Sequence, residues 1–437
     1  MSEEEEFEEK KGFDLREGEE SFALLVGVYK RGEDRRRCEE HLEELKALAD
    51  TFGVTTAAKI PSPVRKINAA TFLLEGKLGE IERIIGEKKV NLVIFDEEIS
   101  PAQQRNLEKR LKVAVMDRAE LILEIFAQRA QTKEARLQID LARTKYEFPR
   151  LKRLWSHFSR QRASGGYLKG EGEKQIEIDR RLLKRKIERL QEELREVRRY
   201  RQTQSASRRR SGVPTFALIG YTNAGKSTLL NSLTEAEVLV EDKLFATLDP
   251  TTRKFILPNN QEVLLTDTVG FIRKLPHTLV AAFRSTLEAA LHDDVLLHII
   301  DVSHPAAEEH AATTCQLLQD LNASQESILT VLNKVDLCKD RRMIDRLRIL
   351  YPKTVAISSL RKTGFEELAQ MMMKELSERR QRIKVKIPQS EYALVAIIRR
   401  EGHIFYEEYE ENDVVVCAEV PIPLLHRFDE YRIEDVQ

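Results

Sequence analysis

Eight residues near the middle of this 437-residue chain have the spacing of a phosphate-binding loop. The segment Gly220–Ser227 fits G-x-x-x-x-G-K-S, follows an apolar strand (216–219) and precedes a predicted helix that begins at Thr228. Glycines at these positions let backbone N–H groups converge on phosphate oxygens, and the helix N-terminus adds partial positive charge. We expect Lys226 to reach the β- and γ-phosphates and the Ser227 hydroxyl to ligate Mg²⁺.

Two motifs downstream have the order of segments that sense a γ-phosphate. The first, Leu244–Arg253, contains three threonines, and by chemistry alone any of them can complete the Mg²⁺ shell. The second, Val263–Gly270, reads as a strand that ends in Asp-x-x-Gly. There Asp267 is expected to hold Mg²⁺ through water, and the Gly270 N–H to contact the γ-phosphate. The three threonines are Thr247, Thr251 and Thr252.

A third motif indicates which base the nucleotide carries. The apolar strand 330–332 runs into Asn333-Lys334-Val335-Asp336, which fits N-K-x-D. A carboxylate at Asp336 accepts two hydrogen bonds from guanine, and adenine lacks that pair of donors. Asn333 and Lys334 are expected to support the loop and pack on the base. Backbone N–H groups of Ser358–Leu360 are expected to bind the guanine carbonyl.

One expected catalytic group is missing from the second switch segment. Many GTPases have a glutamine just beyond Asp-x-x-Gly that orients the attacking water, but here the residue is Phe271. We therefore expect slow intrinsic hydrolysis that depends on a partner, a cation or backbone groups. Asn223 is a candidate for holding a monovalent cation such as K⁺ near the phosphates. The alternative, that Asn223 only caps the loop, is equally compatible with the sequence.

Hydrophobic periodicity predicts an α/β fold in several parts. Strands and helices alternate through the first hundred or so residues, which predicts a small parallel sheet. Predicted helices over 118–155 and 175–201 flank a Gly-rich segment and should pair as an antiparallel hairpin. In the last part we expect strands at 391–399, 403–408 and 413–420. The strands of the first part are predicted at 22–29, 54–60, 90–95 and 113–116, and its helices at 33–52, 76–88 and 101–110.

The fold class is thus a P-loop α/β domain with an N-terminal α/β domain, an antiparallel helical hairpin and a small C-terminal α+β domain. The predicted divisions are an acidic disordered tail (1–20), the N-terminal domain (21–117), the hairpin (118–202) with its tip (163–173), a linker (203–213), the GTPase domain (214–380) and the C-terminal domain (381–437).

Charge is distributed unevenly, although the formal net charge is -1. Residues 151–210 contain nineteen basic and eight acidic residues, whereas both ends of the chain are acidic. A basic hairpin with an aromatic tip suits folded RNA, with cations for phosphates and a ring for stacking. By spacing alone an ordinary helical hairpin is favoured over an RNA-binding arm. The residues expected to contact RNA are Tyr167, Lys169, Arg160 and Arg162.

Other features favour a cytoplasmic protein. The four cysteines are scattered, which fits a reducing compartment, and the N-terminus is acidic where a signal peptide would be basic. No apolar run approaches the length of a membrane span. A monomer is expected.

Four segments together resemble HflX-type GTPases: Gly-Tyr-Thr-Asn-Ala-Gly-Lys-Ser at 220–227, Phe-Ala-Thr-Leu-Asp-Pro-Thr at 245–251, Asp-Thr-Val-Gly-Phe-Ile-Arg-Lys-Leu-Pro-His at 267–277 and Gln-Ile-Glu-Ile-Asp-Arg-Arg at 175–181. The likeness extends over about residues 20–380. It implies that Thr247 is the Mg²⁺ threonine. It also implies a GTPase of the large ribosomal subunit whose arm reaches ribosomal RNA and which acts in splitting stalled ribosomes. At the tip, 165–175, this chain lacks an Arg and a Pro that the family usually has.

The sequence therefore predicts a GTP-hydrolysing switch protein, stimulated by ribosomes, that binds GTP or GDP and Mg²⁺, with K⁺ as a candidate second cation. The alternative is a regulatory GTPase that acts on a protein or membrane partner without RNA contact. Catalytic roles are expected for Lys226, Thr247, Gly270 and Asn223, and Mg²⁺ contacts for Ser227, Thr247 and Asp267. The residues expected to bind GTP are Gly220, Tyr221, Thr222, Asn223, Ala224, Gly225, Lys226, Ser227, Thr228, Phe245, Ala246, Thr247, Leu248, Asp249, Asp267, Thr268, Val269, Gly270, Asn333, Lys334, Val335, Asp336, Ser358, Ser359 and Leu360.

Overall fold

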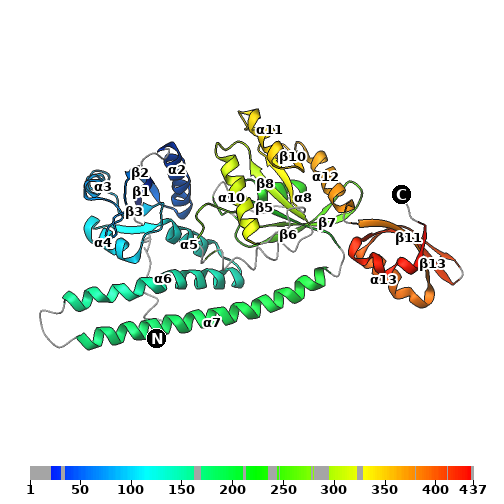
Figure 1. The fold of residues 1–437 in the computed structure, drawn as a ribbon, viewed down its shortest axis with the longest axis horizontal. Coiled ribbons are helices and arrows are strands. Elements are labelled where there is room, and N and C mark those ends of the chain that lie inside the picture. Colours follow the sequence, from blue (N-terminus) through cyan, green and yellow to red (C-terminus); the bar gives the residue numbers. More distant parts are fainter. Residues whose placement is uncertain are drawn as a thin grey trace. The chain divides into compact units, whose positions relative to one another are not determined.

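The computed structural model describes most of the chain, and its contacts divide the chain into two compact units. One comprises residues 1–192 and 274–282, and the other residues 193–273 and 283–437. Figure 1 labels the helices and strands. The described residues are 21–30, 35–161, 169–209, 213–234, 244–245, 247–276, 279, 295–321, 328–378, 380–410 and 412–434; only the backbone is described for 151–161, 169–176, 198, 201–209, 401, 403, 423 and 434.

A four-stranded parallel sheet of order β2-β1-β3-β4 forms the core of the first unit, as predicted. Strands β1, β3 and β4 are apolar runs, as expected where helices cover both faces of such a sheet, whereas the edge strand β2 is mixed and partly exposed. Helix α4 begins at the predicted residue, where the Ser100 and Gln103 side chains each accept a hydrogen bond from the other's backbone N–H. The elements are β1 (Phe22–Lys30), α2 (Arg35–Phe52), β2 (Thr55–Val64), α3 (Glu75–Lys88), β3 (Leu92–Phe95), α4 (Pro101–Leu111) and β4 (Ala114–Asp117).

The prediction of one continuous helix from Arg118 was wrong, because two helices occupy this stretch. Helix α5 (Arg118–Arg129) ends before α6 (Lys133–Gln161) begins. The break follows from local capping: the Thr132 hydroxyl accepts a hydrogen bond from the Ala135 N–H at 3.1 Å. Sequence periodicity did not reveal this cap, since the flanking residues all favour helix.

Helix α6 is fastened to the first sheet by buried polar contacts near its middle. The Tyr146 hydroxyl donates to the Asp117 carboxylate at 2.9 Å, and the Arg150 guanidinium donates to the same carboxylate at 3.1 Å. Burial raises the pKa of Asp117, and the Arg150 charge opposes that shift. Arg150 is therefore committed to a contact within this unit.

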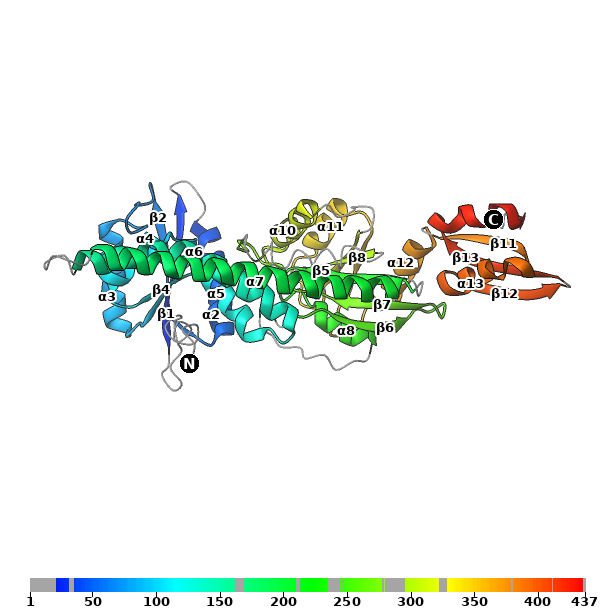
Figure 2. The ribbon, with the colours of Figure 1, turned by 90° about the horizontal axis from the view of Figure 1, so that it is seen from below.

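Helix α7 (Lys169–Arg209) is longer than predicted. It includes residues 169–173 of the expected tip and residues 203–209 of the expected linker. The predicted tip and the predicted linker therefore each included residues that are helical. The part of α7 that belongs to the first unit runs antiparallel to α6 (Figure 2). There the Arg180 guanidinium carbon lies 5.9 Å from the centre of the Phe148 ring.

A six-stranded sheet of order β10-β9-β8-β5-β7-β6 forms the core of the second unit. All neighbouring strands pair in parallel except β6, the edge strand, which is antiparallel to β7. Parallel pairing aligns the carboxyl ends of β5, β7, β8 and β9, where α/β proteins bind ligands. The elements are β5 (Thr215–Gly220), α8 (Lys226–Thr234), β6 (Thr251–Ile256), β7 (Glu262–Asp267), β8 (Val295–Asp301), α10 (Ala307–Asp320), β9 (Ile328–Asn333), α11 (Arg341–Leu350), β10 (Thr354–Ala356) and α12 (Phe365–Ser377).

The C-terminal part is an antiparallel sheet of order β12-β13-β11-β14 with one helix, an α+β arrangement as predicted. The strand predicted at 391–399 was wrong: the segment is helix α13, in which Val395 and Ile398 are buried three residues apart. The elements are β11 (Arg380–Pro388), α13 (Tyr392–Glu401), β12 (His403–Glu410), β13 (Asp413–Pro421) and β14 (Arg432–Glu434), with short 3₁₀ turns at Gln389–Glu391, Ile422–Arg427 and Asp429–Tyr431.

Within the described part of the chain, every helix is too short or too polar to cross a lipid bilayer.

A buried histidine in strand β8 makes folding stability depend on pH. His298 is 1% exposed, both its ring nitrogens lack a hydrogen-bond partner, and burial lowers its pKa to about 4. A histidine pKa that is lower in the folded state means that the unfolded chain binds more protons between pH 4 and pH 6.5. Stability is therefore complete above this window and falls as the pH falls through it.

We predict that the His298→Leu variant loses this acid sensitivity. Between pH 7 and pH 5 the wild-type protein should lose roughly 2 kcal/mol more stability than the variant does. Urea unfolding at several pH values measures the difference. The control is His426→Leu, which replaces an exposed histidine and should keep the wild-type slope. Equal slopes for wild type and His298→Leu would contradict the prediction.

Candidate functional site

The predicted phosphate loop joins β5 to α8, and two of its glycines are required by backbone geometry. Gly220 has φ +154° and Gly225 has φ +93°. A Cβ atom at Gly220 would collide with the Ile299 carbonyl oxygen, and one at Gly225 with the Asn333 side-chain amide. Only glycine tolerates both the conformation and the close approach.

Lys226, the first residue of α8, turns its side chain back over the phosphate loop. Its ammonium donates to the carbonyl oxygens of Gly220 at 3.2 Å and Tyr221 at 2.9 Å. The side chain is 6% exposed, and this burial lowers the pKa of Lys226 to about 8. The nearby Asp267 carboxylate opposes the shift. An anion placed in the loop would raise this pKa and keep the ammonium charged.

Three oxygen-bearing side chains converge beside Lys226. The Ser227 hydroxyl donates to Asp267 Oδ2 at 2.6 Å and lies 2.7 Å from the Thr247 hydroxyl. Asp267 is fully buried, its Oδ1 atom lacks a hydrogen-bond partner, and burial raises its pKa. An all-oxygen set with a buried, undersatisfied carboxylate fits Mg²⁺, which prefers hard oxygen ligands. Thr251 and Thr252, the other two candidates, lie in strand β6 instead.

The Asp-x-x-Gly segment lies directly against the phosphate loop. A Cβ atom at Gly270 would come within 2.7 Å of the Thr222 Cα, so glycine is needed here for close approach. The next residue, Phe271, forms a parallel β-bridge with Tyr221. Its side chain is 2% exposed and is packed in the interior. The residue that replaces glutamine thus presents its backbone, and not its ring, to the loop.

The predicted base-binding residues meet on the other side of the phosphate loop. The Asn333 amide donates to the Ala224 carbonyl at 2.9 Å and accepts from the Ser359 N–H at 3.0 Å. Lys334 donates to the Asn223 carbonyl at 2.8 Å. Asn333 thereby connects the phosphate loop to the loop after β10. An amide suits this position because its NH₂ group donates to one loop and its oxygen accepts from the other.

The carboxylate of Asp336 belongs to the same motif, three residues beyond Asn333. Its side chain is 7% exposed, and its nearest cationic group is the Arg361 guanidinium at 3.5 Å. Ser358 and Ser359 are buried, whereas Leu360 is 77% exposed. A carboxylate that is largely buried here would accept both hydrogen bonds from the guanine edge.

The remaining predicted residues divide into three groups. Thr222, Phe245, Leu248, Thr268 and Val269 are buried around the loop; the Thr222 hydroxyl accepts from the Phe245 N–H at 3.0 Å, and Thr268 donates to the Leu218 carbonyl at 2.7 Å. Thr228, Asp249 and Val335 are partly exposed nearby in the chain. Ala246, Tyr167 and Arg162 lie outside the described residues, and only the backbone is described for Arg160 and Lys169.

Two residues at this site were missed by sequence reasoning. Asp301, at the carboxyl end of β8, forms an ion pair with Lys334 at 2.7 Å. Its position at a strand end, one strand away from Asn333, was a signal that could have found it. His310, in α10, stacks on the ring of Tyr221 at a centroid distance of 3.8 Å. Nothing in the sequence indicates that contact.

Comparison with known proteins agrees with this geometry. Family models described as the N-terminal and middle regions of GTP-binding GTPases match residues 39–127 and 129–208, and one described as "50S ribosome-binding GTPase" matches 215–334. A "GTPase HflX" of Chlamydia pneumoniae is 50% identical over 95% of this chain and 89% of its own length. This chain belongs to the HflX family of GTPases.

Other HflX relatives are more distant but cover as much. The "GTPase HflX" of Akkermansia muciniphila is 41% identical over 96% of this chain and 99% of its own length, and that of Escherichia coli is 38% identical over 92% and 94%. Among solved structures, a GTP-binding protein of Sulfolobus solfataricus in complex with GDP is similar, with 26% identity, a TM-score of 0.45 and coverage of 82% of this chain and 99% of that one. As an HflX GTPase, the chain binds and hydrolyses GTP.

We predict that Asp336→Asn changes which base the protein accepts. An amide in place of the carboxylate cannot accept two hydrogen bonds from guanine, and it can donate one to the extra carbonyl of xanthine. GDP affinity should fall at least about tenfold while xanthosine diphosphate affinity rises. Competition against a fluorescent GDP analogue measures both. If the GDP preference survived unchanged, Asp336 would not select the base.

Proposed function

We propose that this protein is a GTP-driven switch that binds the large ribosomal subunit and acts in ribosome splitting or rescue, with its helical arm on ribosomal RNA. The observation that carries the proposal is the presence, in one chain, of a predicted guanine-nucleotide site and a long helix rich in Lys and Arg. The family description "50S ribosome-binding GTPase", which matches 215–334, supports the choice of partner.

In the proposed site, the Ser227 and Thr247 hydroxyls would hold Mg²⁺, with Asp267 contributing through water. Mg²⁺ supplies neutralisation of charge on the β- and γ-phosphates. Lys226 gives up its contacts with the loop carbonyls to phosphate oxygens, and the Gly270 N–H binds the γ-phosphate. Loss of the γ-phosphate removes a partner from Gly270 and Thr247 together, so both switch segments relax at once.

A low intrinsic rate follows from the packing of Phe271. Because its ring is buried, no side chain at this position orients the attacking water, and we propose that ribosome binding completes the site. Asn223 is exposed at φ +58° beside the phosphate loop. We assign it to a K⁺ ion that supplies positive charge near the phosphates.

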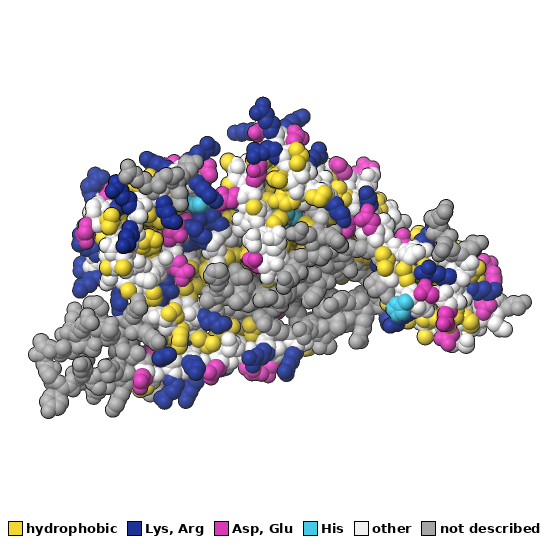
Figure 3. Space-filling view, viewed as in Figure 1, with side chains coloured by type: hydrophobic (Ala, Val, Ile, Leu, Met, Phe, Trp, Pro, Cys, Tyr) yellow, Lys and Arg dark blue, Asp and Glu magenta, His cyan; other side chains and the backbone are white. Residues whose placement is uncertain are grey.

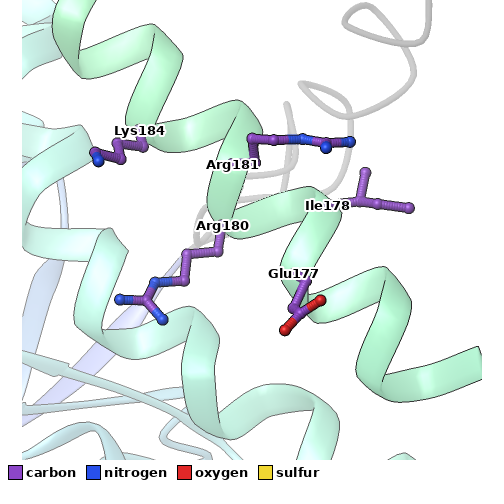
Figure 4. Close-up of a pocket in the computed structure, with 5 residues that line it drawn as sticks. All are labelled: Glu177, Ile178, Arg180, Arg181 and Lys184. Carbon is purple, nitrogen blue, oxygen red and sulfur yellow. The ribbon is translucent and has the colours of Figure 1, made fainter. Parts of the chain in front are cut away.

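The described part of α7 supplies a basic surface for RNA. Exposed Arg180, Arg181 and Lys184, with Glu177 and Ile178, line a cavity of about 520 Å³. Arg180 and Lys184 extend to one side of the helix, and Arg181 to the other (Figure 4). Lys and Arg side chains continue along this helix in Figure 3, with acidic side chains between them. Cations spaced along a helix can neutralise several phosphates of an RNA backbone at once. A compact acidic protein would not need cations spread over such a length.

We predict that reversing these charges weakens ribosome binding. Arg180→Glu with Arg181→Glu and Lys184→Glu should lower the fraction that cosediments with large ribosomal subunits in a non-hydrolysable GTP analogue by about tenfold or more at moderate salt. The wild-type affinity should also fall steeply as salt rises. GDP affinity should not change, since the three residues are on α7.

The matched control reverses three exposed arginines of α11, Arg341, Arg342 and Arg348, and should cosediment much more like wild type. Two results would contradict the proposal: cosedimentation that is equal with GDP and with the GTP analogue, or GTP turnover that ignores ribosomes and responds to lipid vesicles.

We also predict that Asn223→Gly removes cation specificity. Glycine accepts φ +58° without strain, so only the side chain is lost. Wild-type turnover should be faster in KCl than in NaCl, and the variant should turn over at the slower rate in both salts. Turnover by the variant that still rises several-fold in KCl would exclude Asn223 as the ligand.

A further inference from the structure

A stacked pair of aromatic side chains connects Tyr221 of the phosphate loop to helix α10. The Tyr221 ring, 5% exposed, lies parallel to the His310 imidazole, with centroids 3.8 Å apart and an interplanar angle of 3°. His304 extends the cluster, with its centroid 4.5 Å from that of His310. Helix α10 thus fixes the plane of a side chain that belongs to the phosphate loop.

The fixed ring carries its hydroxyl to the second switch segment. The Tyr221 hydroxyl accepts a hydrogen bond from the Arg273 N–H at 2.8 Å. Two backbone bonds join the same segments: the Thr222 N–H donates to the Phe271 carbonyl at 2.6 Å, and the Phe271 N–H donates to the Gly220 carbonyl at 3.0 Å. These backbone bonds reach Phe271, and the Tyr221 hydroxyl adds a contact two residues further along, at Arg273.

The geometry points to Tyr221 as a positioning residue for GTP hydrolysis, held in place by His310. The residues from Gly270 to Arg273 have no glutamine among them, so backbone groups must be correctly placed for water and γ-phosphate. Tyr221 holds the far end of this segment and the backbone bridge holds the near end. The inference concerns the family's GTP hydrolysis and deepens the proposed function by naming what sets the intrinsic rate.

The decisive variant is Tyr221→Phe, which keeps the stacked ring and removes only the acceptor. The buried Arg273 N–H then loses its partner, and the segment from Gly270 to Arg273 is held less firmly against the phosphate loop. The single-turnover rate of GTP hydrolysis, measured without ribosomes at saturating enzyme, should fall about fivefold. Affinity for a fluorescent GDP analogue should stay within about twofold, because the segment senses the γ-phosphate and GDP has none.

His310 provides a rescue test of the stack. His310→Ala removes the surface against which the ring packs and should slow hydrolysis in the same way, whereas His310→Phe restores an aromatic face and should recover most of the rate. The matched control is Tyr351→Phe, which removes another tyrosine hydroxyl of the same domain, one that accepts from Cys315. This control should hydrolyse GTP at the wild-type rate.

Two outcomes would overturn the inference. One is an unchanged single-turnover rate in Tyr221→Phe. The other is a variant that loses GDP affinity and GTP-analogue affinity to the same degree and also unfolds at a lower temperature. That result would give the hydroxyl a purely structural role. Both are measured in the absence of ribosomes, so they are independent of the proposed partner. Failure of wild-type protein to cosediment with ribosomes would refute that partner and leave this test standing.

Discussion

Burial of the Lys226 ammonium next to the Asp267 carboxylate is the constraint on which the nucleotide site depends. Desolvation works against both charges, lowering the pKa of Lys226 to about 8 and raising that of Asp267. Each charge is tolerated because the other is near, and neither is fully compensated within the chain. In the proposed site, a phosphate would compensate the lysine and Mg²⁺ would compensate the carboxylate. The protein therefore gains stability when nucleotide binds, by the amount of that binding.

The sheet supplies the placement that this pair needs. Lys226 follows β5 and Asp267 ends β7, and these two strands are hydrogen-bonded neighbours. Asn333 ends β9 and reaches back across the site to the Ala224 carbonyl. Because the strands are parallel, three residues far apart in sequence lie at one edge of the sheet. Each residue then needs only a short turn to reach the nucleotide.

Prediction from sequence succeeded where local chemistry specifies local structure. Glycines with positive φ, a lysine that opens a helix and an amide that needs two partners are recognisable from spacing, and the structure brings these residues together. The roles assigned to them stay predictions. It failed where two elements compete for the same residues. The break at Thr132 depends on one hydroxyl, and in 391–399 a helical spacing of Val395 and Ile398 outweighs a run of residues that also suits a strand.

Long-range packing was beyond sequence reasoning for a different reason. His310 lies 89 positions from Tyr221, and no periodicity links a helix surface to a loop residue. The same holds for Phe271. The sequence shows that this residue lacks a polar side chain, but not that its ring is buried. With its ring in the core, Phe271 contributes two backbone hydrogen bonds that stiffen the switch at the cost of a water-orienting side chain. A site built this way holds the nucleotide with groups of the chain itself, and we propose that fast cleavage draws further charge from a cation or a partner.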